Sequence, residues 1–210
     1  MLRRGLLLLP LALPACSTMP AEPEPLPRLV TGYGHLTPIR LNVASVEVVP
    51  PGPDAIRISQ PVRVSPEGEI QQMVRERVIA AGTEGSGRFL TRLVEFRREG
   101  QGRQGGLGGM FSGDPGERLS IRLQVRLEVS APDGRSGFVE AEARRQRTVP
   151  DGSTPAQRRR SAEELVHQAM DDLNVEFEFQ VRRTLRSWLV EAVTPPGGEG
   201  GVQVEELPRS

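Results

Sequence analysis

The stretch RLSIRLQVRLEV, residues 118–129, carries the strongest structural signal in the sequence. Every second residue in it is apolar, and every residue between them is polar. Such strict alternation predicts a β-strand with one buried face and one face in water. The apolar positions are Leu119, Ile121, Leu123, Val125, Leu127 and Val129. The rest of the chain must therefore supply neighbouring strands and a layer that covers this apolar face.

Residues 138–149 alternate in the same way and predict the next strand. The Asp-Gly pair at 133–134 between the two strands is a hairpin signal. A symmetric two-residue turn would place the charge of Glu140 opposite the apolar row. A G1-type bulge restores the match of the two faces and can bring Arg126 near Glu140 or Glu142. We therefore expect a bulged hairpin.

A long helix is predicted after these strands. Thr154 is a suitable N-cap, Pro155 takes the first helical position, and Gln157 completes a capping box. Apolar residues then recur at helical spacing from Ala162 to Ala192, which is an amphipathic stripe of roughly ten turns. A helix of about 38 residues would be nearly 57 Å long, more than a small sheet can cover. Prolines end it, and residues 195–210 form a polar tail that we expect to be disordered.

The chain before residue 118 supplies two more strands and a helix. Residues 39–49 and 88–98 are β-branched or alternating and predict strands. Between them, Ser65 and Pro66 are typical of a helix start, and Gly82 of a helix end. The apolar helix residues are Ile70, Met73, Val74 and Val78.

The resulting order of elements is β-α-β-β-β-α. It predicts an α+β fold, a two-layer sandwich in which a four-stranded, mostly antiparallel sheet carries two helices on one face. The first two strands are joined through a helix, so they could be parallel if they are adjacent. We expect a single domain over residues 38–194.

Composition limits the function classes. Apolar residues make up 37% of the 210 residues and aromatic residues 4%, enough for one modest core. The 27 basic residues, all of them arginine, balance 27 acidic residues, so a nucleic-acid partner is not expected. The absence of lysine excludes lysine-based Schiff bases and Walker-type phosphate binding.

No set of residues is typical of catalysis or of a cofactor site. The GxGxxG match at residues 100–105 is followed by more glycines and then a strand, whereas dinucleotide binding needs a helix there. His35 and His167 do not form a metal cluster, and the adjacent Asp171 and Asp172 diverge on a helix. We expect no catalytic residue, no metal and no cofactor, and hence no enzyme.

The chain opens with MLRRGLLLLPLALPACS. Two arginines followed by a short apolar run predict a secretory signal peptide over residues 1–15, too short to span a bilayer. The LPAC stretch that follows resembles the lipobox of bacterial lipoproteins. That resemblance implies cleavage before Cys16 and a diacylglycerol on its thiol, which anchors the chain in a lipid bilayer. The other reading is a plain secretory signal beside an incidental thiol.

The residues after Cys16 bear on location. Ser17 follows the cysteine, where an aspartate favours retention in the inner membrane of well-studied lipoproteins. We therefore expect a periplasm-facing anchor in the outer membrane, with the inner membrane as the alternative. Residues 16–37 are rich in proline and predict an extended tether that holds the domain off the membrane.

Two places are candidates for binding a partner. The glycine-rich loop EGQGRQGGLGGMFSGDPG (99–116) carries Leu107, Met110 and Phe111, which could dock on a partner or a lipid or fold back onto the core. The second candidate lies near the end of the long helix. Its residues, Arg182, Arg183 and Trp188, are of types enriched at binding hot spots.

The chain resembles alphaproteobacterial envelope lipoproteins that share the lipobox, an IRLxVAxxEVV-like strand, a GGLxGxF loop and a long final helix. In order of elements it is also similar to the lipopolysaccharide-assembly lipoprotein and to auxiliary lipoproteins of ABC-type lipid transport. The latter two act by binding partners, and we expect this chain to be a non-enzymatic accessory component of outer-membrane assembly or lipid transport, with an envelope protein or a lipid as partner. The alternatives are a periplasmic hydrolase of cell wall or lipid and a passive structural lipoprotein.

Overall fold

The computed structural model describes residues 32–100 and 116–190. Strand β6 (Glu117–Ser130), which contains the alternating stretch, lies between β5 (Ser86–Gly100) and β7 (Ser136–Val149). It pairs antiparallel with both neighbours along nearly its whole length. All six alternating apolar residues of β6 are buried, so the strand and its inward face are confirmed.

The other edge of β5 pairs with two short strands. β2 (Ser45–Val49) and β3 (Ile56–Ile58) both run parallel to it, and the short 3-10 helix η1 (Pro53–Ala55) connects them. The main sheet therefore has five strands, and the expected number of four is wrong. The parallel pairing of β2 with β5 agrees with the crossover that the sequence suggested.

The expected first strand over residues 39–49 is divided between two sheets. β1 (Ile39–Leu41) pairs in parallel with β4 (Val78–Ala80) in a separate two-stranded sheet, and β2 joins the main sheet. The inward positions change phase at the division: the buried residues up to Val43 occupy odd positions, whereas Val46, which packs against the core from β2, occupies an even one. A one-residue shift turns side chains to the opposite face, so one strand cannot satisfy both runs.

Helix α1 (Pro66–Arg77) begins as predicted, with the Ser65 hydroxyl accepting a hydrogen bond of 3.2 Å from the Gly68 amide. It ends five residues before Gly82, because residues 78–80 pair with β1 instead of continuing the helix. Gly82 has another role. A Cβ at this position would lie 2.6 Å from the Val43 nitrogen, so a close backbone approach requires glycine there.

Helix α2 (Pro155–Thr184) has the predicted capping box. The Gln157 amide donates to the Thr154 hydroxyl at 3.2 Å, and the Gln157 side chain accepts from the Thr154 amide at 2.7 Å. Its 30 residues span roughly 45 Å, less than the expected 57 Å.

The chain leaves α2 at Thr184 in order to pair with β1. After the 3-10 helix η3 (Arg186–Trp188), the Val190 amide donates to the Arg40 carbonyl at 2.9 Å, and the Trp188 carbonyl accepts from the Asn42 amide at 2.7 Å. The apolar residues between 185 and 189 have helical spacing, which is why the sequence predicted a longer helix. In the structure, the turn at η3 and the extended segment after it pack the same residues against the core.

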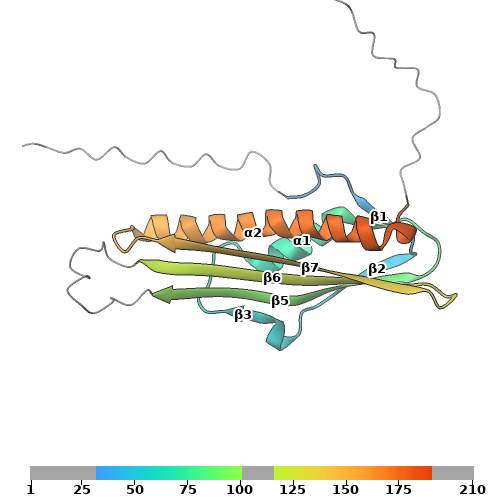
Figure 1. Ribbon diagram of the computed structural model, residues 1–210, viewed down its shortest axis with the longest axis horizontal. Coiled ribbons are helices and arrows are strands. Elements are labelled where there is room, and N and C mark those ends of the chain that lie inside the picture. The colour runs from blue at the N-terminus through green and yellow to red at the C-terminus, as the bar shows by residue number, and fades with distance from the viewer. Residues whose placement is uncertain (1–31, 101–115, 191–210) are drawn as a thin grey trace, which may run out of the picture. The chain divides into compact units, whose positions relative to one another are not determined.

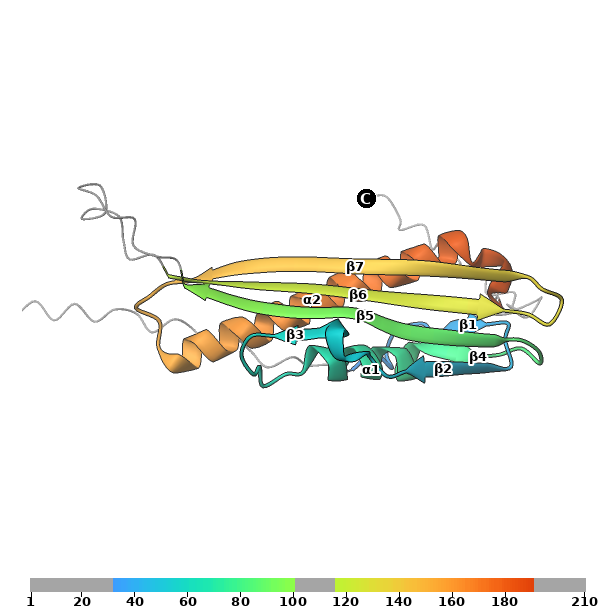
Figure 2. The same cartoon turned by 90° about the horizontal axis from the view of Figure 1, so that it is seen from below.

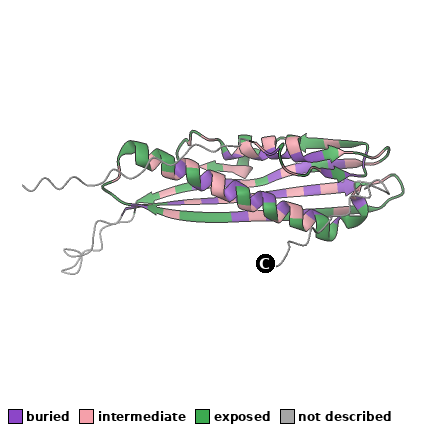
Figure 3. Ribbon diagram, turned by 90° about the horizontal axis from the view of Figure 1, so that it is seen from above, coloured by how far each residue is buried: buried purple, intermediate pink, exposed green. Residues whose placement is uncertain are grey.

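The two α-helices lie on the same face of the main sheet. α2 runs lengthwise over β6 and β7 (Figure 1). α1 lies on the same side of the sheet as α2 (Figure 1 and Figure 2). Between the layers, the rings of Phe89 and Phe177 meet edge to face with centroids 5.7 Å apart. Figure 3 shows the buried positions along the strands beneath α2. The two-layer α+β architecture is confirmed.

The hairpin between β6 and β7 has the bulged geometry that the sequence predicted. Gly134 adopts a φ of +87°, and its amide donates to the Ala131 carbonyl at 3.1 Å. Arg126 then lies opposite Glu140, and their side chains form an ion pair of 2.9 Å.

Tyr33, in the stretch that the sequence assigns to the tether, packs into the core. Its amide donates to the Glu76 carboxylate on α1. This hydrogen bond is the largest contribution that holds the pKa of Glu76 below its usual value. The ordered contacts of the domain therefore begin a few residues before β1.

Candidate functional site

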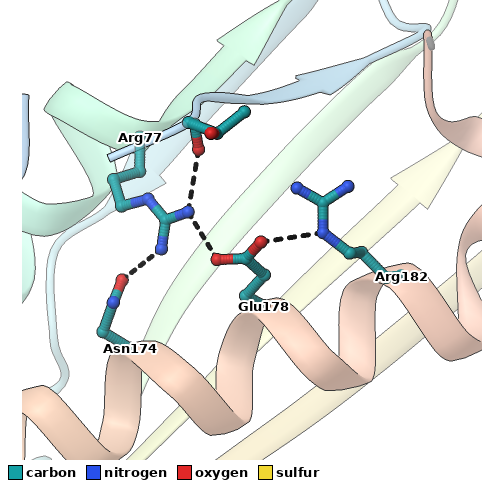
Figure 4. A network of polar contacts seen from close by, with 5 residues as sticks. Arg77, Asn174, Glu178 and Arg182 are labelled. Atoms are coloured by element: carbon teal, nitrogen blue, oxygen red, sulfur yellow. Dashed lines mark hydrogen bonds and ion pairs between the residues drawn. The ribbon is translucent and has the colours of Figure 1, made fainter. Parts of the chain in front are cut away.

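A fully buried arginine is the most unusual side chain of the fold. Arg77, the last residue of α1, is 1% exposed. Its guanidinium donates to the Asn174 side chain, to the Thr37 carbonyl at 2.8 Å and to the Glu178 carboxylate at 2.7 Å (Figure 4). Arg182, one turn further along α2, donates to the other Glu178 oxygen at 2.8 Å. This cluster, the Arg77 network, ties α1, α2 and the segment before β1 together.

The Arg77 network keeps Glu178 ionised. Burial by itself would raise the pKa of Glu178, but hydrogen bonds from Arg77 and Arg182 more than offset it, so the pKa lies below its usual value. A carboxyl group in this state accepts hydrogen bonds and does not donate a proton near neutral pH. Its chemistry is that of a structural ion pair.

A groove of about 600 Å³ lies beside the Arg77 network, where the segment before β1 meets the chain leaving α2. Thr37 belongs both to the network and to the groove. Pro38, Ile39, Leu189 and Val190 give the groove its apolar lining. The backbone hydrogen bond between Val190 and Arg40 holds the two segments of the groove together.

Three arginines also line this groove, which we name the arginine groove: Arg40, Arg182 and Arg186. All three are exposed. Within the described part of the chain, Arg182 pairs with Glu178, and Arg40 and Arg186 have no acidic partner. The groove therefore combines apolar walls with unneutralised positive charge, an arrangement suited to an anionic group on an apolar body.

The residues predicted for binding at the end of the helix are only partly at the surface. Arg182 and Arg183 are exposed on the last turn of α2, and the Arg183 guanidinium lies 5.9 Å from the Phe179 ring centroid. Trp188 is 7% exposed and packs into the core, so little of its side chain is at the surface. The Arg135 guanidinium carbon lies over the Trp188 ring, 5.4 Å from the ring centroid.

The other predicted site residues lie outside the described residues. These are Cys16, at the expected lipidation position, and Leu107, Met110 and Phe111 in the glycine-rich loop. Their roles stay predictions.

Arg77, Arg40 and Arg186 did not emerge from the sequence pattern. One signal for Arg77 was present: it occupies the position that continues the apolar spacing of Ile70, Met73 and Val74 on α1. A charged residue on an apolar helical stripe is buried with partners or breaks the stripe. Arg40 carries no such signal, because only the return of the chain after α2 places it beside Arg186.

The face of the main sheet opposite the helices carries a lattice of ion pairs. Its centre is Glu142 on β7, which accepts hydrogen bonds from Arg144, from Arg122 at 2.8 Å and from Gln124 at 2.6 Å. Hydrogen bonds from Arg144 and Arg122 lower the pKa of Glu142 to about 2. This carboxylate stays ionised at every physiological pH.

Among residues 32–100 and 116–190, His, Cys, Asp and Glu side chains form no group that could hold a metal ion. No helix within those ranges is long and apolar enough to cross a membrane.

No protein-family profile matches this chain, and no curated protein matches it. The solved structures to which this chain is similar include two lipoproteins. One is rare lipoprotein B from Shewanella oneidensis, with 8% identity and a TM-score of 0.39, over 66% of this chain and 95% of that one. The other is a minor lipoprotein from Acinetobacter baumannii, with 10% identity and a TM-score of 0.36, over 74% of this chain and 100% of that one.

Proposed function

We propose that this protein is an envelope lipoprotein that is anchored through Cys16 and acts by binding, without catalysis. The observation that carries the proposal is LPAC at residues 13–16, directly after an apolar run and containing the single cysteine of the chain. An acyl anchor also explains why a secreted chain keeps one thiol, since acylation protects that thiol from oxidation. Several acyl chains give stable attachment, because each buried methylene contributes about 0.8 kcal/mol.

Two carboxylates with lowered pKa, those of Glu142 and Glu178, have a structural role. Glu142 and Glu178 are held ionised by arginine, and each is used to join elements of the fold. A general acid near neutral pH needs the opposite shift, produced by burial without a cation. The arginine groove instead offers an open surface with positive charge, which suits recognition.

We further propose that the anchor lies in the outer membrane and faces the periplasm, because Ser17 follows Cys16. We propose that the domain serves outer-membrane assembly or lipid transport as an accessory component, with an envelope protein or a lipid as its partner.

Membrane fractionation of the wild type and of Cys16→Ala tests the anchor. We expect the wild type in the outer-membrane fraction after a high-salt wash, and the variant as an uncleaved or soluble form. Cys16→Ala that remains in the outer membrane after the same wash would contradict the proposal. The high salt matters, because it removes attachment through exposed charges but leaves an acyl anchor in place.

Crosslinking in intact cells tests the binding role. We expect a stoichiometric partner to travel with the wild-type protein. A protein that crosslinks to nothing in stoichiometric amount, while fractionating normally, would be a passive structural lipoprotein.

A further inference from the structure

We propose that the arginine groove binds the headgroup of an anionic phospholipid in the bilayer to which the chain is anchored. The inference rests on the proposed function, because it names the ligand of a membrane-anchored binding domain. Its basis is charge complementarity: Arg40 and Arg186 lack acidic partners among the described residues, and both line a half-open groove with apolar walls. A phosphate ester on an acyl glycerol matches that combination, because arginine recognises phosphate oxygens through two parallel hydrogen bonds.

A second observation on the same helix points to a lipid surface. Val175 and Phe179 are 68% and 53% exposed, although both are large apolar side chains. With Arg182 they follow one another at spacings of four and three, which puts these three side chains on one side of α2, and Arg186 of η3 lines the groove together with Arg182. This side points away from the core, which α2 contacts through Leu173, Phe177 and Val181.

Apolar residues beside arginines are the composition of a surface that lies against lipid. The apolar side chains enter the boundary between headgroups and acyl chains, and the guanidinium groups contact phosphates. On α2 the two kinds of residue are adjacent, since Arg183 lies over the ring of Phe179. The helix dipole favours arginine at this end of α2 as well, but it does not account for the neighbouring exposed Val175 and Phe179.

The groove also lies close in sequence to the N-terminal end of the described domain. Thr37 and Pro38 line it, and about 20 residues separate them from Cys16. The part of this segment before Gly32 would reach about 55 Å if it were fully extended. Arg40, one of the two arginines of the groove without an acidic partner among the described residues, is therefore close to the anchor in sequence.

Co-sedimentation with lipid vesicles tests the inference. The protein is the mature chain from residue 16 with Cys16→Ser, so that no acyl group contributes to binding. One set of vesicles contains phosphatidylcholine alone, and the other contains phosphatidylcholine mixed equally with phosphatidylglycerol. We expect binding to the mixed vesicles only, since phosphatidylglycerol supplies the net negative charge.

The decisive variant carries Arg40→Gln and Arg186→Gln. Each arginine near an anionic surface contributes about fivefold to the partition coefficient, so we expect the pair to weaken binding about 25-fold. The matched control carries Arg92→Gln and Arg159→Gln. These two arginines are also exposed and also without acidic partners among the described residues, and they lie outside the groove. The control has the same net charge and should retain nearly all binding.

A second pair of variants tests the apolar part of the surface. Phe179→Ser should weaken binding to the mixed vesicles about fivefold, because about half of its side chain is free to enter the lipid. Phe138→Ser is the control, since Phe138 is 51% exposed on the opposite face of the sheet and should leave binding unchanged.

Three results would overturn the inference. One is the absence of any preference for phosphatidylglycerol, and another is an equal loss in both arginine pairs, which would reduce the effect to net charge. The third is full inhibition by soluble glycerol 3-phosphate, which would assign the groove to a free anion. None of these results touches the anchor, so fractionation of Cys16→Ala still tests the proposed function separately.

Discussion

A buried guanidinium needs partners for its charge, and Arg77 finds them through its two terminal nitrogens, so the cost of losing Arg77 is dominated by the groups that remain behind. Arg77→Ala leaves Glu178 and Asn174 without their main partner and opens a space between the helices. Breaking a buried pair in this way costs about 3–5 kcal/mol of unfolding free energy. Chemical denaturation measures that loss. The control is Arg75→Ala, an exposed position on the same helix, where the change should stay within about 0.5 kcal/mol.

An Arg77→Ala protein that unfolds at the same denaturant concentration as Arg75→Ala would show that the Arg77 network contributes little to stability.

Glu142 makes the free energy of unfolding depend on pH in the acidic range. Its pKa is lowered from 4.5 to about 2 in the folded protein, so the folded state favours the ionised carboxylate. The resulting stability is fully present above pH 4.5 and is lost as the pH falls toward 2. Glu142→Gln should therefore flatten the decline of unfolding free energy between these values. Denaturation series at several pH values compare the two proteins, and parallel declines would contradict the expected role of Glu142.

At the scale of elements, β6 was predictable because its pattern is local. Six apolar residues at a spacing of two define the buried face whatever surrounds the strand, and the capping box of α2 is equally local. The ends of elements depend on distant partners instead. α1 stops at Arg77 because β1 offers backbone hydrogen bonds to Val78–Ala80, and α2 stops at Thr184 because β1 also pairs with the chain after η3.

The division of residues 39–49 had a visible signal in the phase of its apolar residues. The same holds for Arg77, which interrupts the apolar stripe of α1 with a charge. The arginine groove had no signal in the sequence. Arg40 and Arg186 are far apart in sequence, and only the pairing of the chain after α2 with β1 brings them together. Patterns with a short period are therefore readable from the sequence, whereas contacts set by topology are not.

Leu123 tests the assignment of the inward face of β6. It is fully buried, so Leu123→Ala should lower the unfolding free energy by about 2–5 kcal/mol. Arg118→Ala, on the opposite face of the same strand, is the control and should change it by about 0.5 kcal/mol or less. Thermal and chemical denaturation measure both, and a Leu123→Ala protein as stable as the control would place the wrong face of β6 inward.

At the scale of the whole molecule, the glycine-rich loop is the second candidate for binding a partner. The triple change Leu107→Ser, Met110→Ser and Phe111→Ser removes its apolar residues. A loop of about 18 residues exceeds what a hairpin needs and is usually functional or disordered. If the loop docks on a partner, crosslinked products should disappear while the melting temperature stays unchanged.

The control for this loop carries Gln101→Ala, Gln104→Ala and Ser112→Ala, which alter its polar residues and should keep the crosslinks. A lower melting temperature in the apolar triple variant would show that these side chains pack on the core. No effect on either measurement would remove the loop as a binding site.

The roles proposed for the groove, the loop and the tether all depend on a lipid anchor at Cys16. The mass of the N-terminal peptide of the mature protein, purified from membranes, tests this anchor most directly. We predict that the peptide begins at Cys16 and carries the mass of a diacylglycerol on its thiol. A mature chain that begins at another residue, or a Cys16 with a free thiol, would contradict the central claim.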